Sequence, residues 1–226
     1  MADMRHCLIE VGSMDEDQNI RLVGAKFITS VFPSSSGFPK SLLPEVAFVG
    51  RSNVGKSSLI NALVGQRALA ISSKTPGRTQ SINFYEVRYK GIEDEELSLL
   101  ANFVDLPGYG YAKRSHKTSS SWIGLAKRYF DRNHLSLLLL LVDARRGPEA
   151  EELQICSLCP AQSSLRVVLT KADQVSRNDL KQMQLKVGGL LEIDTSLVFA
   201  TALTGKKRFG MDELSQVIAR HLIDFG

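Results

Sequence analysis

The chain has 226 residues, 43% of them hydrophobic and 7% aromatic, and a formal net charge of +4. This composition is sufficient for a sizeable core and excludes disordered, collagen-like and disulfide-scaffold proteins. The longest uninterrupted apolar run, Leu137–Val142, is far shorter than the roughly 18 residues of a membrane span, so we expect no membrane association.

The positive charge is unevenly distributed along the chain. Residues 1–20 contain one basic and five acidic side chains, so a basic body follows an acidic start, and a basic body suggests an anionic partner. The three cysteines, without a secretory signal, indicate a reducing cytoplasm. Cys156 and Cys159 form a C-x-x-C without two further zinc ligands, so we interpret both as structural; a redox or metal role is the alternative.

Short apolar runs alternate with helical patterns along the chain. Strands are predicted near Lys26–Val31 and at Glu45–Val49, Ser81–Tyr89, Leu97–Val104, Leu135–Val142, Arg166–Thr170 and Leu197–Ala200. Helices are predicted at Lys56–Val64, Ser121–Asp131, Glu149–Leu158, Asn178–Leu191 and Met211–Ile223, with Ser176 and Asp179 resembling a capping box. The order predicts an α/β three-layer sandwich, with a mostly parallel sheet and one antiparallel edge strand. We expect one domain over residues 22–226, preceded by an acidic segment, 1–21, that is a candidate for disorder.

A phosphate-binding loop is the clearest motif. Gly50–Ser57 (GRSNVGKS) matches G-x-x-x-x-G-K-[ST] between a predicted strand and a predicted helix. The glycines let the backbone curl so that its N–H groups face phosphate oxygens, Lys56 can reach the β- and γ-phosphates, and the Ser57 hydroxyl can bind Mg²⁺. The predicted phosphate-site residues are Gly50, Arg51, Ser52, Asn53, Val54, Gly55, Lys56, Ser57 and Ser58.

Two further motifs indicate which nucleotide binds. Asp105, Leu106, Pro107 and Gly108 form D-x-x-G at a strand end, where Asp105 would contact Mg²⁺ through water and the Gly108 N–H would sense the γ-phosphate. Thr170, Lys171, Ala172 and Asp173 match the guanine-specificity motif. The Asp173 carboxylate would accept hydrogen bonds from guanine N1–H and the 2-amino group, which adenine lacks, so we predict a GTP/GDP site.

Two assignments are less sharp. Ala200, Thr201 and Ala202 follow the last strand, where GTPases have a Ser-Ala segment whose backbone N–H contacts guanine O6. Between the phosphate-binding loop and the D-x-x-G motif, GTPases place a threonine that binds Mg²⁺. We assign this role to Thr79, with Gly77 and Arg78 beside it at the nucleotide, and Thr75 is the competing candidate.

The motifs together resemble those of the EngB (YihA/YsxC) family, within the TrmE-Era-EngA-EngB-Septin-like GTPases. The resemblance rests on GRSNVGKSS at 50–58, SKTPGRTQSINF at 73–84, DLPGYGYA at 105–112 and LTKAD at 169–173, and it covers roughly residues 22–223. It implies one cytoplasmic GTPase domain, which we expect to be monomeric, with Mg²⁺ held by Ser57, Thr79 and Asp105. It further implies a role in assembly of the large ribosomal subunit. The family's link to cell division and septation would follow from ribosome failure.

The resemblance also frames the mechanism, in which Lys56, Thr79 and Gly108 are the predicted catalytic residues. Tyr109 stands where many GTPases have a water-orienting glutamine, which predicts slow intrinsic hydrolysis. Asn53 occupies the position of a K⁺-binding asparagine in potassium-stimulated GTPases, and the alternative is that it only shapes the loop.

The partner is the least determined part of the prediction. Residues 109–134 contain six basic side chains and one acidic one, and Lys206–Arg208 add a second basic group. We interpret the patch formed by Lys113, Arg114, Lys117, Lys127, Arg128 and Arg132 as a ribosomal RNA contact, with a solvated surface as the alternative. The other function classes left open are an ATP-preferring nucleotide kinase, a non-hydrolysing scaffold, and a GTPase acting on another RNA or a septum-associated partner.

Overall fold

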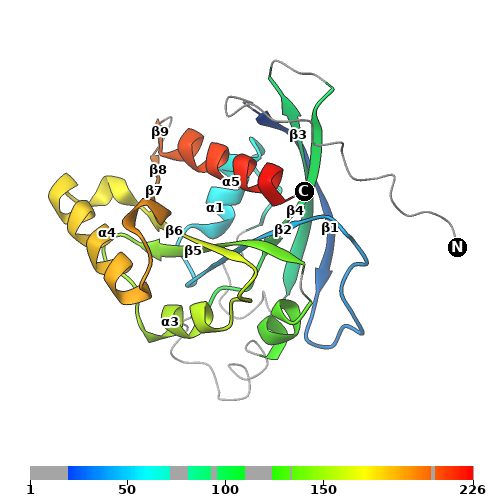
Figure 1. The fold of residues 1–226 in the computed structure, drawn as a ribbon, viewed down its shortest axis with the longest axis horizontal. Helices are drawn as coiled ribbons and strands as arrows, with labels where there is room; N and C mark the ends of the chain where they lie inside the picture. The colour runs from blue at the N-terminus through cyan, green and yellow to red at the C-terminus, as the bar shows by residue number, and fades with distance from the viewer. Residues whose placement is uncertain are drawn as a thin grey trace, which may run out of the picture.

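The computed structural model describes residues 20–71, 81–92, 96–109, 124–132, 134–204 and 207–225 (Figure 1). The strands are β1 (Ile20–Val31), β2 (Glu45–Gly50), β3 (Ile82–Gly91), β4 (Ser98–Asp105), β5 (Leu135–Asp143), β6 (Ser164–Thr170), β7 (Val198–Ala200), β8 (Ala202–Thr204) and β9 (Lys207–Phe209). The helices are α1 (Lys56–Leu63), α3 (Ala150–Ser157), α4 (Arg177–Leu191) and α5 (Met211–Phe225), with a further helical segment at residues 124–130. None of the helices in these ranges is long and apolar enough to span a bilayer.

The sheet confirms the predicted fold class. Seven of the described strands pair in the order β1-β3-β4-β2-β5-β6-β7, and β4, β2, β5, β6 and β7 are parallel. The β3 strand is antiparallel to both of its neighbours, β1 and β4. It lies one place inside the edge, because β1 is longer than its apolar residues indicated and pairs along the whole outer side of β3.

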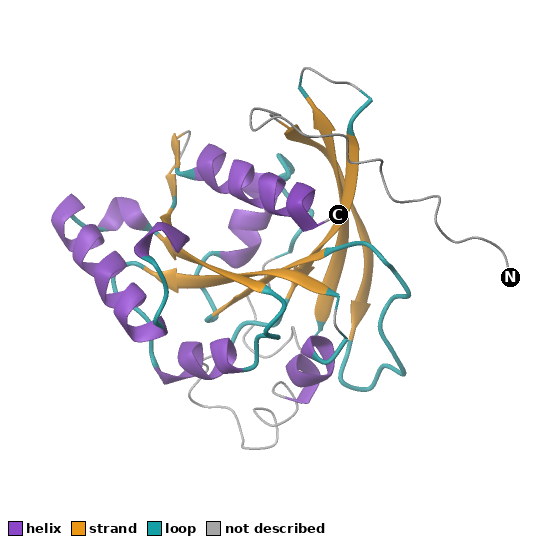
Figure 2. Ribbon diagram, viewed as in Figure 1, coloured by secondary structure: helices purple, strands orange, loops and turns teal. Residues whose placement is uncertain are grey.

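Helices cover both faces of the sheet, which Figure 2 shows. Leu137, Leu139 and Leu141 of β5 pack into the cluster beneath α1 and α5. Leu138 and Leu140 point to the opposite cluster, which contains residues of the 124–130 segment, α3 and α4. The leucine run of β5 is buried on both faces, as expected for a central parallel strand.

The carboxyl ends of the parallel strands meet at one edge of the sheet. Phe48 of β2 pairs with Asp105 of β4, and Asp143 of β5 pairs with Thr170 of β6. The loops that follow β2, β4, β5 and β6 therefore leave the sheet side by side. In open α/β sheets, ligands bind beyond this edge.

The last strands of the chain form a feature that the sequence did not predict. β8 and β9 make a separate antiparallel hairpin between β7 and α5, pairing Ala202 with Phe209 and Leu203 with Arg208. The predicted cap of α4 is present, since the Ser176 Oγ accepts a hydrogen bond from the Asp179 N–H at 3.1 Å. Similarly, Glu149 and Glu152 form a capping box at α3, which the sequence reasoning missed.

Candidate nucleotide site

The phosphate loop connects β2 to α1 in a sharp turn. Asn53 and Gly55 both have positive φ angles, 66° and 109°, and Gly55 is the N-cap of α1. Such angles turn the backbone N–H groups of the loop inward, and the start of α1 adds favourable partial charge for an anion. A Cβ at Gly50 would lie 2.8 Å from the Leu141 carbonyl oxygen, so the loop begins where only glycine fits.

Lys56 and Asp105 form an ion pair in this structure. The Lys56 Nζ contacts Asp105 Oδ1, and the two side chains are only 11% and 6% exposed. Each charge neutralises the other in a site where an unpaired buried charge would be costly. The pair joins the phosphate loop at the end of β2 to the D-x-x-G turn at the end of β4.

The oxygen donors beside this pair suit Mg²⁺. The Asp105 carboxylate is a hard oxygen ligand, and Ser57 follows Lys56 in the first turn of α1. No group of three or more His, Cys, Asp or Glu side chains that could hold a metal exists among the described residues. Mg²⁺ usually binds through one or two protein oxygens plus phosphates and water, so this sparse donor set fits the ion. The third predicted ligand, Thr79, lies outside the described residues, as do Thr75, Gly77 and Arg78.

The D-x-x-G turn lies directly against the phosphate loop. The Ser52 N–H donates to the Tyr109 carbonyl oxygen at 2.9 Å, and the Leu106 N–H donates to the Phe48 carbonyl oxygen at 3.0 Å. A Cβ at Gly108 would lie 2.9 Å from Ser52 Oγ and 3.1 Å from Ser52 Cα. Glycine is therefore required for the two segments to approach this closely.

The guanine-type motif closes the other side of the phosphate loop. The Thr170 Oγ1 donates to the Val54 carbonyl oxygen at 2.8 Å, and the Lys171 Nζ donates to the Asn53 carbonyl oxygen at 2.8 Å. A cavity of about 280 Å³ opens beside them, and Lys171 and Asp173 are among its lining residues. Lys171 has a positive φ of 58°, which turns the chain at the end of β6 into the short 3-10 helix Ala172–Gln174.

The residues after β7 line the same cavity. Thr201, Leu203 and Thr204 contribute to its wall, and the Thr204 hydroxyl donates to Asp173 Oδ2 at 2.6 Å. The Thr201 N–H donates to the Leu169 carbonyl oxygen at 2.8 Å, and its own carbonyl accepts from the Ala172 N–H at 3.1 Å. Ala200 ends β7 and Ala202 is buried. Sequence reasoning missed Thr204, because nothing local signals the hairpin that brings it there.

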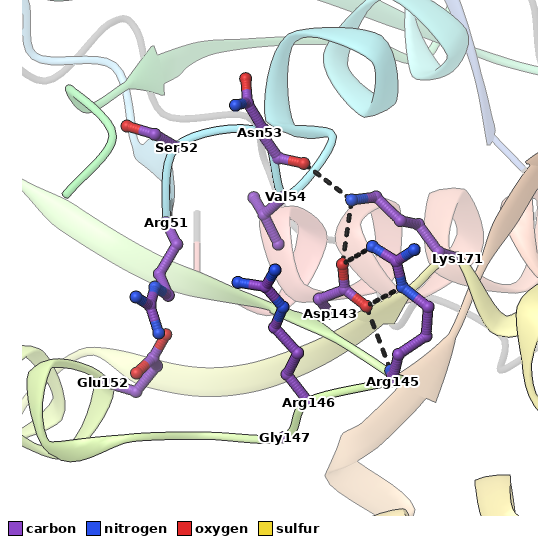
Figure 3. A pocket seen from close by; sticks show the side chains of 10 residues that line it. All are labelled: Arg51, Ser52, Asn53, Val54, Asp143, Arg145, Arg146, Gly147, Glu152 and Lys171. Carbon is purple, nitrogen blue, oxygen red and sulfur yellow. Dashed lines mark hydrogen bonds and ion pairs between the residues drawn. The ribbon is translucent and has the colours of Figure 1, made fainter. Parts of the chain in front are cut away.

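Asp143 and Arg145, which the sequence did not single out, hold the Lys171 side chain in place. Asp143 at the end of β5 accepts from the Lys171 Nζ at 2.9 Å and from Arg145 at 2.6 and 2.8 Å (Figure 3). Hydrogen bonds from Arg145, and then those from Lys171, lower the pKa of Asp143 below its ordinary range. The carboxylate therefore stays charged and holds the lysine at the phosphate loop.

A second cavity, of about 180 Å³, lies on the α3 side of the phosphate loop, and Figure 3 shows the side chains that line it. It lies between the Asp143–Gly147 turn and residues 51–54. Arg51 at its rim forms an ion pair with Glu149 at the start of α3. The phosphate loop is therefore supported from both sides.

Two bases of the predicted RNA patch, Arg128 and Arg132, make contacts within the protein. The Arg132 guanidinium donates to both oxygens of Glu45, at 3.0 and 3.3 Å, and lies 4.7 Å from the Phe38 ring centroid. Arg128 donates to the carbonyl oxygens of Pro33 and Ser35. Both hold the 32–44 loop, and the sequence could not show this because the contacts span some 90 positions.

Of the other basic residues in the predicted patch and in Lys206–Arg208, the structure describes the side chains of Lys127 and Arg208. Lys127 is exposed, and Arg208 is exposed and donates to the Ala62 carbonyl oxygen at 3.3 Å. Lys113, Arg114, Lys117 and Lys206, together with the side chain of Lys207, lie outside the described residues.

The C-x-x-C pair is half-buried at the end of α3, and both cysteines are free thiols. Burial and the neighbouring Cys159 and Glu152 raise the pKa of Cys156 to about 12, and burial raises that of Cys159 to about 11. Thiols with such pKa values are poor nucleophiles at neutral pH, which favours the structural interpretation over a redox role.

A phosphate loop and a guanine-type T-K-x-D segment, at neighbouring strand ends of this parallel sheet, define a P-loop GTPase. The family model described as "50S ribosome-binding GTPase" matches residues 45–171. "Probable GTP-binding protein EngB" of Polynucleobacter asymbioticus is 37% identical over 90% of this chain and 95% of its own. The chain therefore belongs to the EngB family of GTP-binding proteins and is a GTPase.

Solved structures agree with the fold. The crystal structure of a probable GTP-binding protein EngB superposes with a TM-score of 0.60 over 80% of this chain and 99% of that chain, at 18% identity. Era in complex with MgGDPNP and a 16S ribosomal RNA segment superposes with a TM-score of 0.60 at 25% identity, over 79% of this chain and 56% of that one. The chain thus corresponds to little more than half of Era.

Proposed function

We propose that this GTPase is a nucleotide-dependent switch that assists assembly of the large ribosomal subunit. The observation that carries the proposal is the convergence of three motifs at one sheet edge in a chain that matches a ribosome-binding GTPase family. The working unit is a single domain over residues 22–226, which β1 extends slightly toward the N-terminus. Effects on cell division and septation would follow from ribosome failure.

The site residues divide by the part of GTP that each would contact. Gly50–Ser58 and Gly108 would hold the phosphates, and the sequence assigns Gly77, Arg78 and Thr79 to the same part of the nucleotide. Thr170–Asp173 hold the base with the residues around Thr201. Because the Thr204 hydroxyl already binds one oxygen of Asp173, the guanine N1–H and 2-amino group would be received by a carboxylate whose orientation is set.

Mg²⁺ would be held by Ser57, Thr79 and Asp105, and when bound it neutralises charge on the phosphates. Lys56 would then exchange its contact with Asp105 for the β- and γ-phosphates. Lys56 and Asp105 would thus each keep an oppositely charged partner after their ion pair separates. An Asp105→Asn variant should lose the magnesium dependence of GTP affinity, which titration with and without EDTA measures.

Hydrolysis should be slow without a partner. Tyr109 cannot orient water as a glutamine does, because its side chain is 7% exposed and its hydroxyl donates to Glu152 at 3.0 Å. A K⁺ ion near Asn53 would supply the missing positive charge at the phosphates. Hydrolysis rates in KCl and NaCl test this: a faster rate in KCl that Asn53→Ala abolishes is expected, and equal rates would end the potassium proposal.

The proposed partner is ribosomal RNA of the large subunit, met in the cytoplasm by a monomer. Support for the large subunit comes from the family description, and support for an anionic partner comes from the basic body of the chain. Co-sedimentation with large subunits over a salt series tests it. Retention with a GTP analogue, but not with GDP, is expected, together with a steep salt dependence. Equal pelleting with both nucleotides would count against the nucleotide-dependent switch, and no pelleting with either nucleotide would favour another RNA or a septum-associated partner.

A further inference from the structure

Tyr109, which directly follows the D-x-x-G turn, is held at two points. Its carbonyl oxygen accepts the Ser52 N–H of the phosphate loop at 2.9 Å. Its hydroxyl donates to Glu152 Oε1 at 3.0 Å, and Tyr109 and Glu152 are 7% and 1% exposed. One buried residue therefore joins the phosphate loop to the first turn of α3.

Glu152 is itself held by its second oxygen. The Glu149 N–H donates to Glu152 Oε2 at 2.9 Å, and the Glu149 carboxylate forms an ion pair with Arg51 of the phosphate loop. The contacts make a closed ring, from the phosphate loop through Tyr109 and Glu152 to Glu149 and back to Arg51. Figure 3 shows Arg51 and Glu152 facing each other along this wall of the cavity.

The Tyr109 contact is chemically robust. Burial and the Glu152 carboxylate raise the pKa of Tyr109 well above its ordinary value, so the hydroxyl remains a donor across the physiological range. A hydrogen bond from a neutral donor to a buried carboxylate is stronger than one between neutral groups. Leaving a buried carboxylate without its donor is costly, so the pair resists separation.

The ring constrains Gly108, which lies between Asp105 and Tyr109. A Cβ at Gly108 would already meet Ser52, so the turn has little freedom once Tyr109 is anchored. We propose that Tyr109 and Glu152 are positioning residues, which hold the Gly108 N–H at the γ-phosphate side of the phosphate loop and thereby favour GTP over GDP. This inference rests on the proposed role of Gly108 as the γ-phosphate contact.

Nucleotide affinities of the full chain and of Tyr109→Phe, Glu152→Gln and the double variant test the proposal. Tyr109→Phe removes the hydroxyl that donates to Glu152, and Glu152→Gln removes the charge of the accepting carboxylate. Neither variant removes a proposed contact to GDP. GTP-analogue affinity should fall roughly five- to tenfold, with GDP affinity within about twofold of the parent. If the two residues act as one unit, the double variant loses no more than the worse single variant.

Tyr89→Phe is the matched control, because Tyr89 is a 1% exposed tyrosine in β3 that packs in the opposite core cluster. It should leave the ratio of GTP to GDP affinity unchanged, whatever its effect on melting temperature. Unchanged ratios in the Tyr109 and Glu152 variants, or strictly additive losses, would overturn the positioning role. A parent protein that binds neither nucleotide would instead refute the proposed function, and the positioning role with it.

Discussion

Replacing Arg132 by Met should lower the free energy of unfolding of this protein. The Arg132 side chain is 13% exposed and neutralises Glu45, whose side chain is 1% exposed. Methionine keeps the apolar stem against Phe38 but leaves a buried carboxylate unpaired. Breaking one side of a buried pair costs about 3–5 kcal/mol, out of a total stability of about 5–15 kcal/mol for a domain.

The penalty should depend on pH in a defined direction. Burial raises the pKa of Glu45 above its ordinary value of 4.5, and Arg132 is the largest influence that lowers it. Without Arg132 this pKa rises further, so the folded state binds more protons than the unfolded state. Stability then falls as pH increases from the unfolded pKa toward the folded one. The loss in Arg132→Met should therefore be smaller at pH 5 than at pH 7.5.

Urea unfolding at both pH values measures these free energies, and Glu45→Gln/Arg132→Met is the matched control. The double variant has no buried carboxylate that lacks a charged partner. It should therefore recover most of the lost stability, and its stability should no longer depend on pH in this way. A penalty below about 1 kcal/mol, the range of an exposed pair, would refute the reasoning. An equal penalty at the two pH values would refute it as well.

Three further outcomes are expected. Asp173→Asn should lower GTP affinity by about two orders of magnitude and improve binding of xanthosine triphosphate, because an amide donates where the carboxylate accepts; competition against a fluorescent nucleotide measures both. Thr170→Val should cost about 1–2 kcal/mol of unfolding free energy and weaken GDP, since the Val54 carbonyl loses its buried donor, and an unchanged chemical denaturation midpoint would contradict this. Cys156 and Cys159, with pKa values raised to about 12 and 11, should react with a thiol reagent at pH 8 far more slowly in the folded than in the urea-unfolded chain.

The nucleotide motifs could be predicted from the sequence because their chemistry is local. The curl of Gly50–Ser57 depends on neighbouring glycines, and the strand-motif-helix order places Asp105 and Thr170 at the same sheet edge whatever the rest of the chain does. The leucine run of β5 was likewise predictable, because a short, fully apolar run is typical of a strand that is covered on both faces.

What supports those motifs was decided only by the tertiary structure. In the sequence, Arg132 cannot be told from a solvated basic residue. In the fold it contacts Glu45 and Phe38, which are far away in the chain. Thr204 reaches Asp173 because a hairpin of short strands follows β7, and Glu152 reaches Tyr109 because α3 packs beside the phosphate loop. Such contacts depend on side chains that are brought together by packing, over separations at which sequence spacing carries no information.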